Sequence, residues 1–362
     1  MTLIGLMSGT SLDGVDAVLA DFDAAGRPHL RGHCQLPWPE SLQQTLREVT
    51  GNTPLHRVLA LDAALPRYYA DAVAQLLHHT GQTAAGVSAI GLHGQTVWHA
   101  PHASPPVTSQ IGDPSRLAAA SGITVVADFR QRDLAEGGEG APLAPLFHSA
   151  LFASAEARGV LNLGGIANLT LLGPGGVVLN GFDCGPANTL LDAWARRHRG
   201  MPFDSEGAWA AGGQVDHALL ERLLADPFFR RQPPKSTGPE HFSTDWLEQH
   251  LSGRENPVDV QATLAELTAR STAAAVSGAP QPLQDLVVAG GGAANLDLLA
   301  RLERAVHPLP VVTSDALGYP AGTVEALGFA WLARAALQGE PLALERVTGA
   351  RRPARLGGIY PA

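Results

Sequence analysis

The chain has 362 residues, of which 45% are hydrophobic and 16% are charged. This composition gives enough apolar material for sizeable cores, has none of the bias of a disordered chain, and at this length predicts about two domains of ordinary size. The formal net charge of −9 argues against a nucleic-acid partner, because phosphate backbones are bound through basic surfaces.

The sequence gives no indication of secretion or membrane insertion. Residues 1–6 lack the basic start and the long apolar stretch of a secretory signal. Charges, glycines or prolines interrupt every apolar run before it is long enough to span a bilayer. The only cysteines are Cys34 and Cys184, which cannot form a disulfide framework and suit a reducing compartment. We therefore expect a soluble, cytoplasmic protein with no membrane partner.

The chain opens on a hairpin pattern, in which short apolar strands flank a glycine-containing turn at residues 8–14. Amphipathic periodicity then predicts two helices, and buried apolar runs predict two further strands with a helix between them. In chain order, these elements are expected at residues 3–7, 15–20, 40–49, 55–80, 87–92, 114–121 and 123–127.

A second glycine-turn hairpin is predicted in the middle of the chain, at residues 159–172. It is followed by a short apolar run at 177–179 that suits a further strand, by a strand at 286–289 and by helices at 296–305 and 323–337. Two such hairpins in separate halves predict two related α/β lobes around a cleft. We expect an N-terminal lobe over 1–133 and a C-terminal lobe over 134–339, with a crossing near 137–145 and with residues 340–362 packing back on the first lobe.

The turns of both hairpins are candidate phosphate-binding loops. In residues 8–14 (SGTSLDG), small side chains let backbone N–H groups and hydroxyls approach a polyphosphate. The segment lacks the spacing of a P-loop and lies between two strands, so an ordinary hairpin turn is the alternative. The turn at 164–168 (GGIAN) would hold the other side of the phosphates.

Residues 290–295 (GGGAAN) follow a predicted strand. Consecutive glycines allow a flat ring such as adenine to pack on bare backbone, although a tight strand-to-helix turn capped by Asn295 explains them equally. The segment has neither the G-x-G-x-x-G spacing nor the later acidic residue of a dinucleotide site.

Asp183 follows a short apolar segment and precedes a Gly-Pro pair and a helix at 189–197. A carboxylate in that position can project into a cleft while the turn holds it rigidly. The alternative is that it caps the helix or its turn.

Residues 92–102 contain three histidines, but no carboxylate or thiol nearby completes a zinc site. His93 and Thr96 are better suited to hydrogen-bonding a polyol. Arg130 follows a buried strand, at the end where open α/β sheets hold ligands. It can grip a carboxylate through two hydrogen bonds, or it can pair with Asp128 or Asp133.

Lys235, the only lysine, lies in a stiff polar loop at 233–240. Its ammonium group either contacts a nucleotide or sugar, or pins the loop against its own lobe.

Taken together, these segments resemble the anhydro-N-acetylmuramic acid kinase family. The resemblance extends in order over nearly the whole chain, at residues 5–16 (GLMSGTSLDGVD), 94–99 (GQTVWH), 110–114 (QIGDP), 126–130 (VADFR), 137–143 (GGEGAPL), 162–168 (NLGGIAN) and 234–238 (PKSTG).

The family implies the two-lobed, ribonuclease H-like α/β fold of actin, Hsp70 and hexokinase, with ATP and sugar bound in the cleft between the lobes. It also implies ATP and Mg²⁺ as cofactors, a homodimer, and a role in peptidoglycan recycling. Asp183 matches the catalytic aspartate, a base that activates water. The expected sugar contacts are Thr96, Arg130 and Glu325. The expected ATP contacts are Gly9, Thr10, Ser11, Leu12, Asp13, Gly14, Val15, Asp16, Gly164, Gly165, Asn168, Gly290, Gly291 and Gly292.

The chain departs from the family pattern at two positions. Met7 stands where the superfamily commonly has an aspartate, so the metal is expected to be held elsewhere or mainly by phosphate and water. Ala187 stands where the family more often has glycine, which raises the question of whether that backbone needs a positive φ.

Two other functions remain compatible with the motifs. A conventional kinase of the same superfamily would phosphorylate an intact sugar without consuming water. A nucleotide-switched binding protein would use the same fold to control a partner, but the chain shows no appended binding domain, linker or basic patch for one.

Overall fold

The computed structural model describes residues 1–9, 12–233, 235–238 and 240–362. The chain forms two compact units: unit 1 contains Met1–Leu151 and Thr323–Ala362, and unit 2 contains Phe152–Gly322. The chain enters unit 2 after Leu151, later than the boundary expected at 133, and returns at Thr323, earlier than the one expected at 339.

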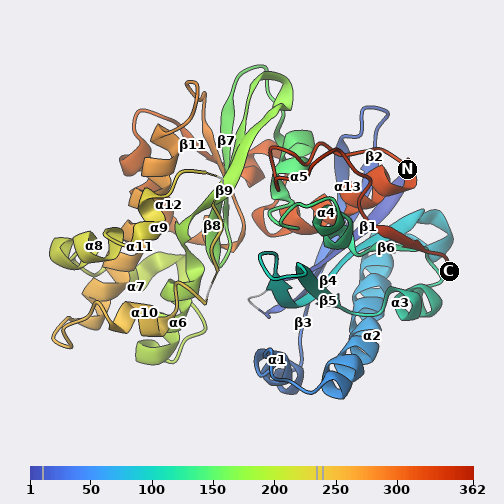
Figure 1. The fold of residues 1–362 in the computed structure, drawn as a ribbon, viewed down its shortest axis with the longest axis horizontal. Helices are drawn as coiled ribbons and strands as arrows, with labels where there is room; N and C mark the ends of the chain where they lie inside the picture. Colours follow the sequence, from blue (N-terminus) through green and yellow to red (C-terminus); the bar gives the residue numbers. More distant parts are fainter. Residues whose placement is uncertain (10–11, 234, 239) are drawn as a thin grey trace. The chain divides into compact units, whose positions relative to one another are not determined.

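Unit 1 is built on a sheet of seven strands in its described part (Figure 1). Its main path has the order β12-β6-β4-β1-β2-β3, and β5 pairs with β4. The first three strands are antiparallel, whereas β4 runs parallel to β1 and β6 parallel to β4. The strands are β1 (Thr2–Ser8), β2 (Gly14–Phe22), β3 (Pro28–Pro37), β4 (Ala89–Ala100), β5 (Val107–Ile111), β6 (Val125–Ala127) and β12 (Gly358–Tyr360).

Helices cover both faces of this sheet. The helices of unit 1 are α1 (Glu40–Arg47), α2 (Leu55–Thr80), α3 (Pro114–Ser121), α4 (Phe129–Ala135), α5 (Ala144–Phe152) and α13 (Val324–Leu337). Leu65, Tyr69 and Leu76 of α2 share a buried cluster with Ile4 and Leu6 of β1.

The helix α13 touches the sheet almost backbone to backbone. A Cβ atom on Gly5 of β1 would overlap the carbonyl oxygen of Ala326, and one on Gly91 of β4 would overlap that of Phe329. The Phe329 ring also lies 6.4 Å from the ring of Phe147 in α5. These contacts explain why α5 and α13 belong to unit 1.

Unit 2 repeats the strand order of unit 1. Its sheet has the order β11-β10-β7-β8-β9, with antiparallel β7, β8 and β9 followed outward by parallel β10 and β11. In unit 1 the same pattern runs β6-β4-β1-β2-β3. The strands of unit 2 are β7 (Arg158–Leu163), β8 (Ile166–Leu172), β9 (Val178–Pro186), β10 (Leu286–Ala289) and β11 (Val311–Thr313).

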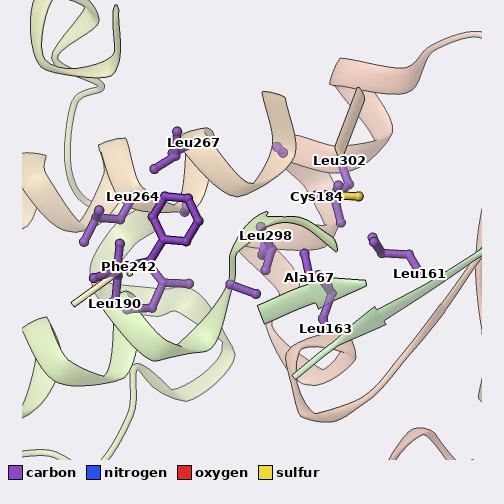
Figure 2. Packing of buried hydrophobic residues seen from close by; sticks show 14 of the residues in the cluster. Leu161, Leu163, Ala167, Cys184, Leu190, Phe242, Leu264, Leu267, Leu298 and Leu302 are labelled. Carbon is purple, nitrogen blue, oxygen red and sulfur yellow. The ribbon is translucent and has the colours of Figure 1, made fainter. Parts of the chain in front are cut away.

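The core of unit 2 lies between this sheet and its helices. Figure 2 shows Leu161 and Leu163 of β7 and Ala167 of β8 in one cluster with residues of α6, α11 and α12. The Phe242 ring packs in the same cluster. The helices of unit 2 are α6 (Asn188–Arg199), α7 (Ala208–Ala211), α8 (His217–Leu224), α9 (Pro227–Arg230), α10 (Thr244–Glu248), α11 (Pro257–Ser277) and α12 (Leu296–Val306).

The α/β class and both hairpins are confirmed, with differences in extent. The strand expected at 177–179 is the start of β9, which runs on through Asp183 to Pro186. Neither β3 nor the 21-residue helix α11 was predicted, although Pro257 at the first turn and Gly278 after the last one are ordinary helix boundaries. Over the described residues, no helix combines the length and apolarity required to cross a membrane.

Candidate functional site

The glycine turn of unit 1 joins β1 to β2. Two of the expected phosphate contacts, Thr10 and Ser11, lie outside the described residues. The Leu12 N–H donates to the Gly9 oxygen at 3.2 Å, and Leu12 has a left-handed φ of 60°. Gln95 Nε2 of β4 donates to the same Gly9 oxygen at 3.3 Å. The start of the turn is therefore tied to the neighbouring parallel strand.

Asp16 lies in β2, just beyond this turn. Its pKa is raised to about 7, mainly by burial and then by the negative charges of Glu325 and Asp13, while a hydrogen bond with Gln35 opposes the shift. Glu325 is in the first turn of α13, which the packing of that helix on β1 and β4 brings to this end of the sheet.

Arg130 lies in the first turn of α4, after β6. Its guanidinium donates to His93 Nε2 at 3.0 and 3.3 Å and to the Gly140 oxygen at 2.7 Å. Burial and the charge of Arg130 lower the pKa of His93 to about 3, so the imidazole is neutral and accepts. Burial lowers the pKa of Arg130 only to about 10, which leaves a charged fork at neutral pH.

The two carboxylates expected as ion-pair partners of Arg130, Asp128 and Asp133, each accept hydrogen bonds from other groups. Asp133 is fully buried and accepts from Thr348 Oγ1 at 2.5 Å and from the Gly140 N–H at 2.6 Å. Asp128 accepts from the Tyr360 hydroxyl. The observed partners of Arg130 are therefore neutral groups, an arrangement in which the cation can still engage an anionic ligand.

The remaining sugar contact expected in unit 1 is Thr96. Gln110 Nε2 of β5 donates to Thr96 Oγ1 at 3.3 Å, so the hydroxyl hydrogen can point to another acceptor. His99 pairs with Thr108 Oγ1 at 3.0 Å. Among the described residues, no group of three or more His, Cys, Asp or Glu side chains is arranged to hold a metal ion.

In unit 2, Asp183 of β9 stands directly opposite Asn168 of β8. Asn168 Nδ2 donates to Asp183 Oδ1 at 2.9 Å, and the Thr237 N–H donates to Asp183 Oδ2 at 2.8 Å. Burial raises the pKa of Asp183 to about 6, although these hydrogen bonds and Lys235 lower it; Glu240 raises it further. The carboxylate is thus ionised at neutral pH and more basic than an ordinary aspartate.

The glycine turn of unit 2 is shorter than expected, since only Gly164 and Gly165 connect β7 to β8. The carbonyl of Gly164 accepts from the Asn188 N–H, and that of Gly165 accepts from the N–H groups of Ala187 and Thr189, at 3.0 to 3.1 Å. Because a trans peptide points its N–H opposite to its carbonyl, the N–H groups of Gly165 and Ile166 face away from α6.

Ala187 has φ −125°. The φ at this position is therefore negative, and glycine is not required there to provide a positive φ.

The three consecutive glycines after β10 are glycine for different structural reasons. Gly290 has φ +82° and its missing Cβ would overlap the side chain of Asn162, and a Cβ on Gly292 would lie 2.6 Å from that of Leu163. Gly291 is exposed, and its Cβ would meet nothing within 4 Å among the described atoms. Asn295 caps α12 by accepting from the Leu298 N–H at 2.9 Å. Gly290 and Gly292 are therefore required by packing, and Gly291 is not.

The sequence alone does not indicate that Asn168, Asp183 and Thr237 form one group. It predicts Asn168 as a nucleotide contact, and it allows Lys235 either to contact a nucleotide or sugar or to pin its loop. The loop holds β9 in place, since the Asp183 N–H donates to the Lys235 oxygen at 3.1 Å. The sequence signal was present in the NLGGIAN and PKSTG segments, but only the strand register shows that they meet at Asp183.

Comparison with known proteins gives a consistent picture. A sequence model of the family described as anhydro-N-acetylmuramic acid kinase matches residues 1–362. The anhydro-N-acetylmuramic acid kinase of Chromohalobacter salexigens is 51% identical over 370 residues, covering 99% of this chain and 98% of that protein. The protein of the same name from Bordetella petrii is 51% identical over 366 residues, with coverage of 99% and 96%.

Among solved structures, component A of (R)-2-hydroxyglutaryl-CoA dehydratase from Acidaminococcus fermentans matches with a TM-score of 0.50 at 12% identity. The match covers 91% of this chain and 96% of that chain. At this identity the likeness concerns the fold alone.

Proposed function

Since the chain belongs to the anhydro-N-acetylmuramic acid kinase family and is thus a sugar kinase, we propose that it uses ATP to open 1,6-anhydro-N-acetylmuramic acid. The product is N-acetylmuramic acid 6-phosphate, formed in the recycling of peptidoglycan. The observation that supports this chemistry best is the carboxylate of Asp183, fixed by two N–H donors and with its pKa raised to about 6.

Asp183 acts as the general base. A base is most effective when its pKa lies near the working pH, because it is then both ionised and able to take a proton. Each oxygen of the Asp183 carboxylate accepts one hydrogen bond. A carboxylate offers about four acceptor positions, so both oxygens retain one for a water molecule.

The reaction exchanges three bonds. The water oxygen attacks C1 of the sugar and its proton passes to Asp183, while the bond between C1 and O6 breaks. The released O6 bonds to the γ-phosphorus of ATP, and the bond from that phosphorus to ADP breaks. Glycoside hydrolysis ordinarily needs a second carboxyl group to protonate the departing oxygen. Here the phosphorus captures that oxygen, so one carboxylate is sufficient.

We assign the ATP phosphates to the two glycine turns. In unit 1 this is the segment 9–16, and in unit 2 it is Gly164 and Gly165, where the N–H groups of Gly165 and Ile166 turn away from α6 as donors. Asn168 completes the turn's hairpin, and its amide nitrogen is directed to Asp183. The bare backbone at Gly291, with Gly290 and Gly292 beside it, suits the adenosine.

Mg²⁺ that accompanies ATP neutralises charge on the transferring phosphoryl group. The described residues offer no cluster of protein ligands for such an ion, and Met7 replaces the expected aspartate. We assign most of its coordination to phosphate oxygens and water, as is usual for Mg²⁺.

The sugar is assigned to Thr96, Arg130 and Glu325 of unit 1. Arg130 keeps its charge and is hydrogen-bonded only to neutral groups among its observed partners, which suits the lactyl carboxylate of the muramic acid. Thr96, whose oxygen accepts from Gln110, has its hydroxyl hydrogen to donate.

The test is to incubate the purified protein with ATP, Mg²⁺ and 1,6-anhydro-N-acetylmuramic acid and to locate the phosphate by NMR. We expect a reducing sugar phosphorylated at O6. A product that retains the anhydro ring and carries phosphate on another hydroxyl would identify a conventional sugar kinase instead, and ATP turnover independent of every sugar would exclude both.

A further inference from the structure

Two side chains beside Asp183 share an unusual feature. Asn168 and Thr237 each hold the carboxylate through one N–H group, and each has a second polar atom that is buried without a partner among the described residues, namely Asn168 Oδ1 and Thr237 Oγ1. Buried polar atoms are normally hydrogen-bonded. Two orphaned oxygens at one carboxylate therefore point to a missing hydrogen-bonding molecule.

The orientation of the Asn168 amide follows from its neighbour. An ionised carboxylate only accepts hydrogen bonds, so the nitrogen of the amide must face Asp183 Oδ1 and the oxygen must face elsewhere. Asn168 is 8% exposed, and its strand position opposite Asp183 is fixed by the pairing of β8 with β9. Asn168 Oδ1 is consequently held close to the carboxylate, because it belongs to the same amide group as the nitrogen that donates to Asp183.

Thr237 is held as firmly by its surroundings. Its N–H lies 2.8 Å from Asp183 Oδ2, and two residues earlier the Lys235 oxygen accepts from the Asp183 N–H. The Lys235 ammonium lies 4.6 Å from the centre of the Phe228 ring and donates to the Phe228 oxygen at 3.4 Å. The only lysine thus anchors the segment to α9, and the Thr237 hydroxyl is kept near the carboxylate.

We infer that Asn168 Oδ1, Thr237 Oγ1 and the Asp183 carboxylate form a binding site for a single water molecule, the one that attacks the sugar. Asn168 and Thr237 are positioning residues in this arrangement. The inference rests on the proposed role of Asp183 as the base.

The chemistry of the three groups suits a water that reacts. A buried water typically has two to four polar partners. This one donates one hydrogen to Asp183 and the other to Asn168 Oδ1, while its oxygen accepts from the Thr237 hydroxyl. A lone pair is left to attack C1. Holding a reactant in such a geometry raises the rate without requiring tighter binding of the other substrates.

The key variant is Thr237→Val, which removes the hydroxyl and keeps both the shape of the side chain and the backbone N–H. We expect kcat to fall about 10- to 100-fold, the scale on which a misplaced reactant costs rate, with the KM values for ATP and sugar unchanged. The acid limb of the pH profile should stay in place, because the N–H that lowers the pKa of Asp183 remains. Thr237→Ser restores the hydroxyl and should recover most of kcat.

Asn168→Ala removes both the acceptor for water and a donor to Asp183. We expect a comparable fall in kcat together with an upward shift of the acid limb, since that hydrogen bond lowers the pKa of Asp183. The other charged or titratable groups acting on Asp183 are Lys235, Glu240 and Cys184, and both variants leave them unchanged. The melting temperatures of all three variants should match that of the parent protein, which checks that the fold is kept.

Three outcomes would overturn the water site. Full kcat in Thr237→Val, together with a loss in Asp183→Asn, would mean that Asp183 is the base but that the Thr237 hydroxyl does not hold the water. Asn168→Ala with a raised KM for ATP and a normal kcat would make Asn168 a nucleotide contact. An equal loss in Thr237→Ser and Thr237→Val would show a packing effect. Normal turnover in Asp183→Asn would instead remove the proposed function itself.

Discussion

Units 1 and 2 share one strand order, and in each an acid pairs with an amide across the second and third strands. The strand that carries the acid differs between the two units. In unit 1 the third residue of the second strand is Asp16, and it pairs with Gln35 on the third strand. In unit 2 the third residue of the second strand is Asn168, and it pairs with Asp183 on the third strand. The acid and the amide have exchanged places between the two halves of a repeated fold.

The exchange changes what each carboxylate can do. Asp16 has two further carboxylates near it, Glu325 and Asp13, and its pKa is raised to about 7. Asp183 receives two N–H hydrogen bonds and its pKa is about 6. At neutral pH the carboxylate of unit 2 is mostly ionised and held in one orientation, whereas that of unit 1 is close to half protonated. The same topology therefore provides an ionised carboxylate suited to act as a base in unit 2, and a partly protonated carboxylate less suited to that role in unit 1.

The strongest test of this difference replaces each carboxylate by its amide. Asp183→Asn should fold and bind both substrates but lose on the order of 10²–10⁴ in kcat, the usual contribution of a positioned base. Asp16→Asn should lose much less. Steady-state kinetics at saturating ATP and sugar measure both, with Asp71→Asn on the exposed side of α2 as control. Equal losses in Asp16→Asn and Asp183→Asn would show that the two carboxylates do not differ in this way.

The next effect concerns the cation of unit 1. Arg130→Lys keeps the charge but removes the planar fork that can bind a carboxylate through two hydrogen bonds. We expect the KM for the sugar to rise about 10- to 100-fold, because a hydrogen bond to a charged group contributes roughly 1.5–3 kcal/mol, with a smaller change in kcat. Arg132→Lys is the matched control, since Arg132 pairs with Glu136. An unchanged KM in Arg130→Lys would remove Arg130 from the sugar site.

The pH dependence gives a third, intermediate effect. The base must be ionised, so kcat/KM should fall as pH drops through the pKa of Asp183, about 6, by about tenfold per pH unit below it. An ordinary aspartate would place this limb about two units lower. Profiles of kcat/KM from pH 4.5 to 8, a range chosen to include that pKa, would show where the acid limb lies. The ionic strength is kept constant. A flat profile down to pH 5 would contradict the raised pKa.

The smallest expected effects lie in the triple glycine of unit 2. Gly292→Ala places a Cβ 2.6 Å from that of Leu163 and should lower the free energy of unfolding by about 1–3 kcal/mol, as overpacking does. Gly291→Ala meets open space and should leave that free energy nearly unchanged while raising the KM for ATP. Urea unfolding monitored by fluorescence separates the two. A normal KM for ATP in Gly291→Ala would leave the adenosine without this contact.

Features of the fold that depend on local signals could be predicted from the sequence. Glycine turns between apolar runs predict both hairpins, which the structure confirms. The end of a buried strand predicts Arg130 as a ligand contact, and that role stays a prediction. The Asn168–Asp183 pair could not be predicted, because it depends on the register of β8 against β9. The contact from Thr237, 54 residues further on, depends on how a loop folds back. The place of α13 in unit 1 likewise follows from its packing on Gly5 and Gly91, which local periodicity does not show.

In the proposed reaction, Asp183 directs water to the anomeric carbon while O6 passes to the phosphorus. The most direct measurement is the reaction in water labelled with oxygen-18, quenched quickly because an anomeric hydroxyl exchanges slowly with solvent, and followed by mass spectrometry of the product fragments. If Asp183 activates water in this way, the label appears in the C1 hydroxyl and the oxygen of the phosphate ester is unlabelled. Label in the phosphate ester, or none at C1, would exclude attack of water on C1.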